Sequence, residues 1–264
     1  MKKILVLWLV TVALFSCSPY QKALKTEDVA VKFDMATKQY DKGKYNKAIR
    51  LFEQIAPSYR GKPQAEKMFY LFSQAYYKTE QYYLAGYQFE NFASSYPKSE
   101  KLEEASFLSA KCYSKLSPVY SLDQADTFKA INKLQAFIDD FPNSADLAEA
   151  NAVLRILTDK VEKKVFENAK QYNTISDYKS ALIALDNFID DYPGTKFKED
   201  ALYYRLDSAY YLAINSVSSK MQERLQNAKT AYTVLLKFNE NTKYRTKADE
   251  MLAKIETELQ QFAK

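Results

Sequence analysis

Apolar residues recur along this chain with the spacing of a helix face. Three times, a small residue is followed four and seven positions later by large apolar ones: Ala85, Phe89 and Phe92; Ala130, Leu134 and Phe137; Ala181, Leu185 and Phe188. Residues three and four positions apart lie on the same side of an α-helix. We therefore expect each alanine to be buried where a neighbouring helix approaches closely, with the larger side chains filling the space on either side.

Each of these helices is followed by the same signal for a turn. The phrase FIDDYPGT at 188–195 recurs almost unchanged at 137–144 and more loosely at 92–99, which is an internal repeat with a spacing of 45 to 51 residues. The proline in each copy cannot continue a helix and disfavours a helical residue before it, so the helix should end there. A hydroxyl residue follows two positions later, and we expect it to be the N-cap of the next helix: Ser99, Ser144 and Thr195.

The pattern predicts paired helices from residue 27 onward. The expected ranges are 27–41, 45–57, 64–79, 82–95, 100–117, 125–141, 145–173, 177–191, 196–216, 220–238 and a last, unpaired 243–262. The turn at 41–44 contains a glycine, which can adopt the left-handed conformation. Residues 117–126 are the most loop-like insertion. The predicted fold is all-α: a solenoid of about five helical hairpins with a C-terminal capping helix.

The N-terminus has the features of an export signal. Lys2 and Lys3 precede an apolar run over 4–15. That run is short for a membrane span, so residues 1–16 are predicted to be a signal peptide.

The apolar run closes on Leu-Phe-Ser-Cys at 14–17, which resembles a bacterial lipoprotein box. The resemblance implies that Cys17 becomes the lipidated N-terminus and that 17–28 is a tether, although Phe15 is bulkier than the usual residue. No acidic residue follows Cys17 directly, which favours the outer membrane. The alternative is an ordinary signal peptide with an incidental cysteine.

Composition and charge argue against several further classes of site and partner. Four glycines in 264 residues leave few points for glycine-rich ligand loops. The formal charge of +5 falls to +3 without the two signal lysines, and the charges are mixed in sign along the helices, which argues against nucleic-acid binding. With Cys17 committed to lipid, Cys112 has no partner for an internal disulfide and is interpreted as a small buried residue.

The sequence predicts no catalytic residues, no metal site and no cofactor. Asp139–Asp140 and Asp190–Asp191 look like paired carboxylates. Adjacent residues on a helix point about 100° apart, however, so neither pair converges on one substrate atom. The chain also has no histidine, no Ser-centred elbow and no Gly-rich phosphate loop. We therefore expect a binding scaffold and not an enzyme.

The second hairpin is similar to a tetratricopeptide repeat. The matching residues are Phe69, Phe72 and Tyr76 on its first helix, and Ala85, Phe89, Phe92 and Pro97 on and after its second. Together with the lipoprotein box, the number of repeats, the size and the sequence Ala-Tyr-Tyr-Lys at 75–78, they make the chain resemble the BamD-type lipoproteins of the outer-membrane β-barrel assembly machine. The repeat motif alone is common, so the specificity of this resemblance comes from the combination.

That resemblance implies a lipid-anchored scaffold on the periplasmic face of the bacterial outer membrane. Repeats 1 and 2, at 29–98, would bind unfolded outer-membrane proteins. Repeats 3 to 5 and the capping helix, at 99–264, would dock on the barrel-forming subunit of the machine, beside its other lipoproteins. The anchor would be the chain's only contact with the membrane, and nucleic acid would not be a partner.

The tetratricopeptide register also implies which side chains face the binding groove. They are Ala30, Phe33, Thr37 and Tyr40 in the first repeat, and Lys67, Tyr70, Gln74 and Tyr77 in the second. Such an aromatic groove with a cationic edge suits an extended peptide that ends in an aromatic residue. The alternative for each tyrosine is a place in the core.

Two other functions remain open from the sequence. One is a tetratricopeptide lipoprotein that organises the envelope by linking the outer membrane or peptidoglycan to other complexes. The other is a glycan-capturing lipoprotein built on the same repeats. The first often carries a coiled-coil segment, and the second is usually longer with large insertions. Neither feature is evident in this chain.

Overall fold

The computed structural model describes residues 18–262, which form helices and no strands. The predicted signal peptide and Cys17 lie outside this range. The helices are α2 (Pro19–Lys25), α3 (Val29–Asp41), α4 (Tyr45–Tyr59), α5 (Ala65–Lys78), α6 (Tyr82–Ser95), α7 (Leu102–Leu116), α8 (Ala125–Asp140), α9 (Leu147–Thr174), α10 (Tyr178–Asp191), α11 (Lys198–Ile214), α12 (Ser218–Phe238) and α13 (Arg245–Gln260). From α3 onward, each matches a predicted helix with both ends within two residues. The all-α solenoid of hairpins is therefore confirmed.

Helix α2 was not predicted, because residues 17–28 were interpreted only as a tether. Pro19 occupies its first turn, where a missing N–H costs nothing, and the Ser18 side chain accepts a hydrogen bond from the Gln21 N–H at 3.3 Å. Tyr20 and Ala23 are buried, and α2 packs on α3. Seven residues are too few to show a helical pattern of apolar positions in the sequence. The helix forms because Tyr20 and Ala23 are buried against the helices that follow.

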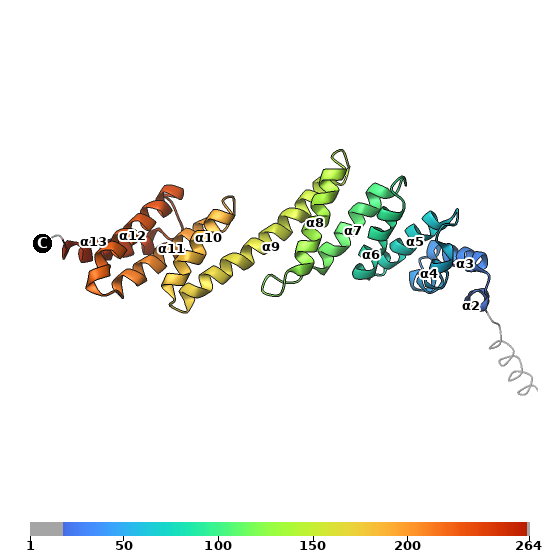
Figure 1. The fold of residues 1–264 in the computed structure, drawn as a ribbon, viewed down its shortest axis with the longest axis horizontal. Helices are drawn as coiled ribbons and strands as arrows, with labels where there is room; N and C mark the ends of the chain where they lie inside the picture. The colour runs from blue at the N-terminus through green and yellow to red at the C-terminus, as the bar shows by residue number, and fades with distance from the viewer. Residues whose placement is uncertain (1–17, 263–264) are drawn as a thin grey trace, which may run out of the picture. The chain divides into compact units, whose positions relative to one another are not determined.

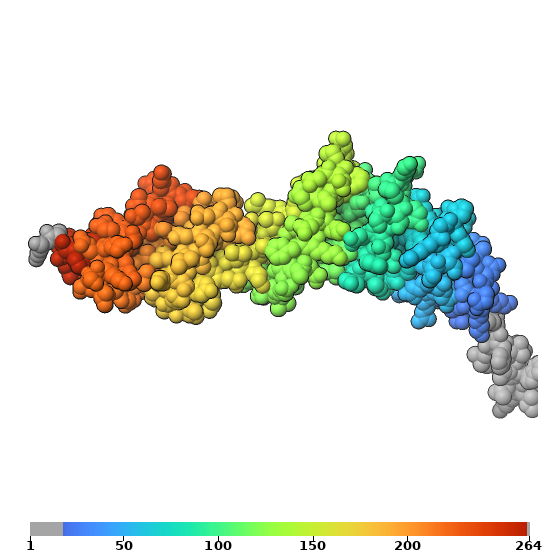
Figure 2. All heavy atoms as spheres, viewed as in Figure 1, coloured from blue at the N-terminus to red at the C-terminus, as the bar shows by residue number. Residues whose placement is uncertain are grey.

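The helices divide into two compact units. The first contains residues up to 117 together with 125–154, and the second contains 118–124 and the residues from 155 on. Helix α9 begins in the first unit and ends in the second. In the first unit, α3 to α8 are three successive hairpins, each helix packed on the next (Figure 1). Side chains fill the spaces between neighbouring helices on the face of each unit drawn in Figure 2.

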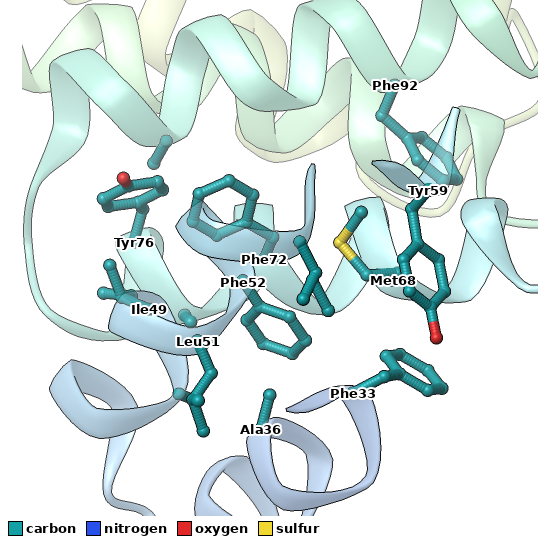
Figure 3. Close-up of a cluster of buried hydrophobic side chains, with 14 of the residues drawn as sticks. Phe33, Ala36, Ile49, Leu51, Phe52, Tyr59, Met68, Phe72, Tyr76 and Phe92 are labelled. Carbon is teal, nitrogen blue, oxygen red and sulfur yellow. The ribbon is translucent and has the colours of Figure 1, made fainter. Parts of the chain in front are cut away.

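The core of the first unit is local to neighbouring hairpins. Figure 3 shows Phe52 of α4 between Ala36 of α3 and Phe72 of α5, whose ring centroid lies 5.7 Å from that of Phe52. In the second unit, residues of α9, α10 and α11 form a similar cluster: Phe166, Ala169, Ala181, Leu185, Phe188 and Ala201. Each helix thus buries its apolar side against its chain neighbours, as in a solenoid.

The predicted burial of the repeated alanines is confirmed. Ala85, Ala130 and Ala181 have no exposed surface, and the phenylalanine seven positions after each is at most 2% exposed. Gly86, next to Ala85, marks another close approach, because a Cβ there would lie 3.2 Å from the Cβ of Cys112 on α7. The Ser109 hydroxyl donates to the Gly86 carbonyl at 3.0 Å and ties α6 to α7.

The expected N-caps are corrected by the structure. Helix α7 begins at Leu102, three residues after Ser99, whose hydroxyl accepts from the Lys101 N–H at 3.0 Å. Ser144 and Thr195 likewise accept from the N–H two residues on. A short hydroxyl side chain next to a turn bonds its own neighbouring backbone. These residues therefore hold the turn that leads into the helix and are not its N-cap.

The same turn occurs a fourth time without its proline. The Asn239 N–H donates to the Leu235 carbonyl, and the Thr242 N–H donates to the Asn239 carbonyl, as at the three repeated phrases. Glu240 stands at the proline position. Without a proline, the turn is held by these backbone hydrogen bonds and by the Thr242 hydroxyl, which accepts from the Tyr244 N–H at 3.3 Å. The Glu199 carboxylate of α11 also accepts from the Asn239 amide and from the Lys243 N–H, each at 3.2 Å.

Candidate functional site

The structure buries one of the predicted groove residues of α3 and leaves another half-buried. Phe33 is 5% exposed, and its ring lies 5.2 Å from that of Tyr59 (Figure 3). Tyr40 packs edge-to-face on Tyr45 at 5.2 Å and contributes to the same core. Ala30 is exposed and Thr37 is intermediate. The side of α3 predicted to face a groove therefore contributes little exposed aromatic surface.

On α5, the predicted residues Tyr70 and Gln74 join a hydrogen-bonded cluster with α7. The Gln74 amide donates to the Tyr70 hydroxyl at 2.9 Å and to Glu104 at 3.3 Å. Lys101 bonds the same carboxylate at 3.0 Å, and its ammonium lies 5.4 Å from the Tyr70 ring centroid. Because these groups satisfy one another, they fix the spacing of α5 and α7.

The cluster also sets the charge of its members. Burial, followed by the hydrogen bond to Glu104, raises the pKa of Tyr70, so its hydroxyl stays protonated and can donate. Burial alone would raise the pKa of Glu104, but hydrogen bonds from Tyr70 and Lys101 bring it below its usual value. Glu104 is therefore a carboxylate under ordinary conditions, and this side of the first unit carries a fixed negative charge beside the Lys101 ammonium.

Two predicted residues, Tyr77 and Lys67, present more accessible groups. Tyr77 is half-buried, with its ring centroid 6.1 Å from Tyr82 and 6.4 Å from Phe89. Lys67 is exposed and lines a hollow of about 360 Å³ with Phe33 and Thr37. The other lining residues of that hollow are Asp34, Lys38, Asp41, Lys42 and Gln64. The predicted residues are therefore not brought into one groove. Phe33, Thr37 and Lys67 line this charged hollow, Tyr70 and Gln74 belong to the cluster between α5 and α7, and Tyr40 and Tyr77 pack on other rings.

A second cleft, which the sequence did not predict, lies among α5, α6 and the segment that follows α4. It has a volume of about 480 Å³ and is lined by Arg60, Gly61, Phe69, Tyr87, Gln88, Asn91, Phe92, Ser95 and Tyr96. Tyr87 is 52% exposed. It stands two positions after the buried Ala85, about 200° around the helix, so it points away from the face that packs on the rest of the core. The signal in the sequence was the pair Tyr83 and Tyr87, aromatic residues four apart and outside the core stripe.

The chemistry available elsewhere is limited. Burial raises the pKa of Cys112 to about 12, so its thiol is a poor nucleophile. Asp139 and Asp140 are exposed, and Asp139 accepts from Gln135 at 2.9 Å. Among residues 18–262, no three His, Cys, Asp or Glu side chains are grouped so as to hold a metal ion. None of the helices described is both long and apolar enough to cross a membrane.

Comparison with known proteins decides the family. Residues 26–173 match the family YfiO, described as outer membrane lipoprotein. The chain belongs to this outer membrane lipoprotein family. The match runs from just before α3 to the end of α9, so it includes both the predicted groove residues and the unpredicted cleft.

Among individual proteins, this family member is similar to the outer membrane protein assembly factor BamD of Caulobacter vibrioides. The two are 20% identical over 192 residues, which are 73% of this chain and 63% of that relative. The chain thus spans less than two thirds of its relative's length. The resemblance to BamD-type lipoproteins is confirmed by these matches. A solved Podosopora anserina kinesin light chain with nearly identical TPR-like repeats is 14% identical, with a TM-score of 0.33, over 79% of this chain and 96% of that one.

Proposed function

We propose that this protein is a non-enzymatic lipoprotein subunit of the machinery that assembles outer-membrane β-barrel proteins. The observation that carries the proposal is the family match over residues 26–173, supported by similarity to a BamD assembly factor. A solenoid of helical hairpins suits this role, because it offers long surfaces to partners without a closed active site. Lipidation of Cys17 after removal of residues 1–16 would hold the protein at the periplasmic face of the outer membrane.

Client binding is assigned to the first unit. Tyr40, Tyr70 and Tyr77 are half-buried rings along α3 and α5, and Lys67 is an exposed cation on the same helices. An extended peptide from an unfolded barrel could lay aromatic side chains against these rings and direct its terminal carboxylate to the lysine. Phe33 and Gln74 would support the surface from within, because both are buried.

Docking on the barrel-forming subunit is assigned to the second unit. Tyr178 of α10 and Tyr211 of α11 are stacked with ring centroids 5.4 Å apart. Ile175, just before α10, is 60% exposed, and Tyr172 at the end of α9 is 42% exposed. Clustered, accessible aromatic and aliphatic residues are typical anchors of protein interfaces.

The experiment that tests the function is affinity purification of the tagged protein after mild solubilisation of the envelope. The assembly role predicts that a β-barrel membrane protein co-purifies, and that Tyr178→Ala with Tyr211→Ala reduces its recovery. Lys229→Ala, elsewhere in the second unit, is the matched control. Recovery of a peptidoglycan-bound partner in place of a barrel protein would instead support the envelope organiser.

A further inference from the structure

The positive charge of the chain is concentrated next to the proposed anchor. Residues 18–50 contain eight Lys and Arg against four Asp and Glu, a net charge of +4. Residues 51–264 contain 28 against 29, a net charge of −1. The cationic stretch directly follows Cys17 and forms α2, α3 and the start of α4. The excess charge of the mature chain therefore lies within its first helices.

A hollow between α2 and α4 collects two of these cations. It has a volume of about 650 Å³, and Lys47 and Arg50 of α4 line it. The Lys47 ammonium lies 5.1 Å from the ring centroid of Tyr20, whose hydroxyl donates to the Lys47 carbonyl at 3.3 Å. Burial of Tyr20 thus holds α2 against α4 and keeps the hollow in place.

The two cations are available to a ligand. Lys47 and Arg50 are both exposed, and within residues 18–262 neither forms an ion pair with a carboxylate. The acidic residue in the lining, Glu53, accepts a hydrogen bond from the Tyr76 hydroxyl at 2.8 Å. Ser18 and Gln21 add a hydroxyl and an amide to the lining. This set of groups is suited to a phosphate diester.

We propose that this hollow binds the headgroup of an anionic phospholipid in the membrane that holds the protein. Two observations select a lipid: the unpaired cations are complementary to its phosphate, and Ser18 in the lining is the residue after Cys17. The inference rests on the proposed lipidation, which places Cys17 at the membrane surface. A basic patch beside acyl chains is a second membrane signal, and it orients the first hairpin toward the headgroups. The anchor is then not the chain's only membrane contact.

The test is vesicle co-sedimentation of the chain from residue 17 onward with Cys17→Ser, which carries no acyl group. Vesicles of phosphatidylglycerol with phosphatidylethanolamine are compared with phosphatidylcholine alone at low salt. We expect binding to the anionic vesicles only. Lys47→Gln with Arg50→Gln should weaken it by roughly 30-fold, which is about 2 kcal/mol or one for each cation. Lys220→Gln with Lys254→Gln removes equal charge from the second unit and should have little effect.

Three results would overturn the proposal. One is equal binding to both kinds of vesicle, or none to either. Another is an equal loss in the two double variants, which would show attraction to net charge without a site. The third is binding of inorganic phosphate alone, without vesicles, at least as tight as binding to the anionic vesicles, which would assign the hollow to free phosphate. Mass spectrometry of the membrane-extracted wild type tests lipidation of Cys17 separately, so failure of the anchor and failure of headgroup binding give different results.

Discussion

Replacing Tyr77 by alanine distinguishes a client contact from a core contact. The ring packs on Tyr82 and Phe89 but is only half-buried. Removing a fully buried ring costs about 3–5 kcal/mol, and a half-buried one should cost about half as much. We therefore expect Tyr77→Ala to lower the free energy of unfolding by about 2 kcal/mol. For a unit of this size, the melting temperature should fall by about 4–8 °C, and the protein should remain folded.

The same substitution should weaken client binding more than its effect on stability can explain. A groove tyrosine that contacts a peptide aromatic is worth about 2 kcal/mol, the scale of an interface hot spot, which is a loss of roughly 30-fold in affinity. Fluorescence anisotropy with a labelled peptide from the terminal strand of a barrel protein measures the affinity. Circular dichroism measures the melting temperature of the same samples.

Tyr87→Ala is the matched control, because Tyr87 lies on α6 in the unpredicted cleft and is 52% exposed. If the client binds to Tyr40, Tyr70 and Tyr77 on α3 and α5, the Tyr87→Ala variant should keep the wild-type affinity and nearly the wild-type melting temperature. Loss of binding in Tyr87→Ala, with Tyr77→Ala unchanged, would place the client in the cleft and refute the groove assignment. A collapse of the melting temperature in Tyr77→Ala would make Tyr77 a core residue.

Three further predictions concern the anchor, the core and pH. Cys17→Ser should give soluble or unprocessed protein, because stable anchoring needs two or more acyl chains; a processed, membrane-bound mutant on fractionation would contradict lipidation. Ala181→Leu should overpack the fully buried site between α9 and α10 and cost about 1–3 kcal/mol in urea unfolding, whereas an unchanged midpoint would contradict the packing. Burial raises the pKa of Asp207, against a hydrogen bond from Asn173, so the folded state holds this proton more tightly than the unfolded state. That contribution to stability is lost as pH rises above the ordinary value of 3.8. Asp207→Asn should therefore melt higher than wild type at neutral pH, with an advantage that shrinks toward pH 3.8; a gap independent of pH would refute the assignment.

The helices were predictable because the spacing of the apolar residues and the residues that stop a helix indicate the same ranges. Ala181, Leu185 and Phe188 lie on one side of a helix, and Pro193 stops it, so two independent signals indicate the same element. Helix α2 lacked both signals. Its seven residues are too few for a periodic pattern, and its stability comes from the contacts of Tyr20 and Ala23 with later helices.

The candidate surfaces were harder to predict. The register of a helix indicates the direction in which a side chain points, but it does not indicate how much of that side chain is exposed. The positions of Tyr70 and Gln74 were assigned to a groove, but their accessibility depends on Glu104, which reaches them from α7 thirty residues later. The cleft at Tyr87 depends on the distance from α6 to Arg60 and Gly61, which follow α4. Such distances depend on side-chain volumes across several hairpins, and a periodic pattern does not contain them.

The turn at 239–242 is equivalent to the turns at the three repeated phrases, so these four joints between hairpins can replace one another. Four joints share one set of backbone bonds, and one of them forms without proline. A hairpin cut out at two such joints and inserted between two others would meet matching ends. Gene duplication can therefore lengthen or shorten the array in whole hairpins without redesigning a connection, as the additive stability of stacked repeats allows. Glu240→Pro would make the fourth joint identical to its relatives and should stabilise it by about 0.4–1 kcal/mol by restricting the unfolded chain.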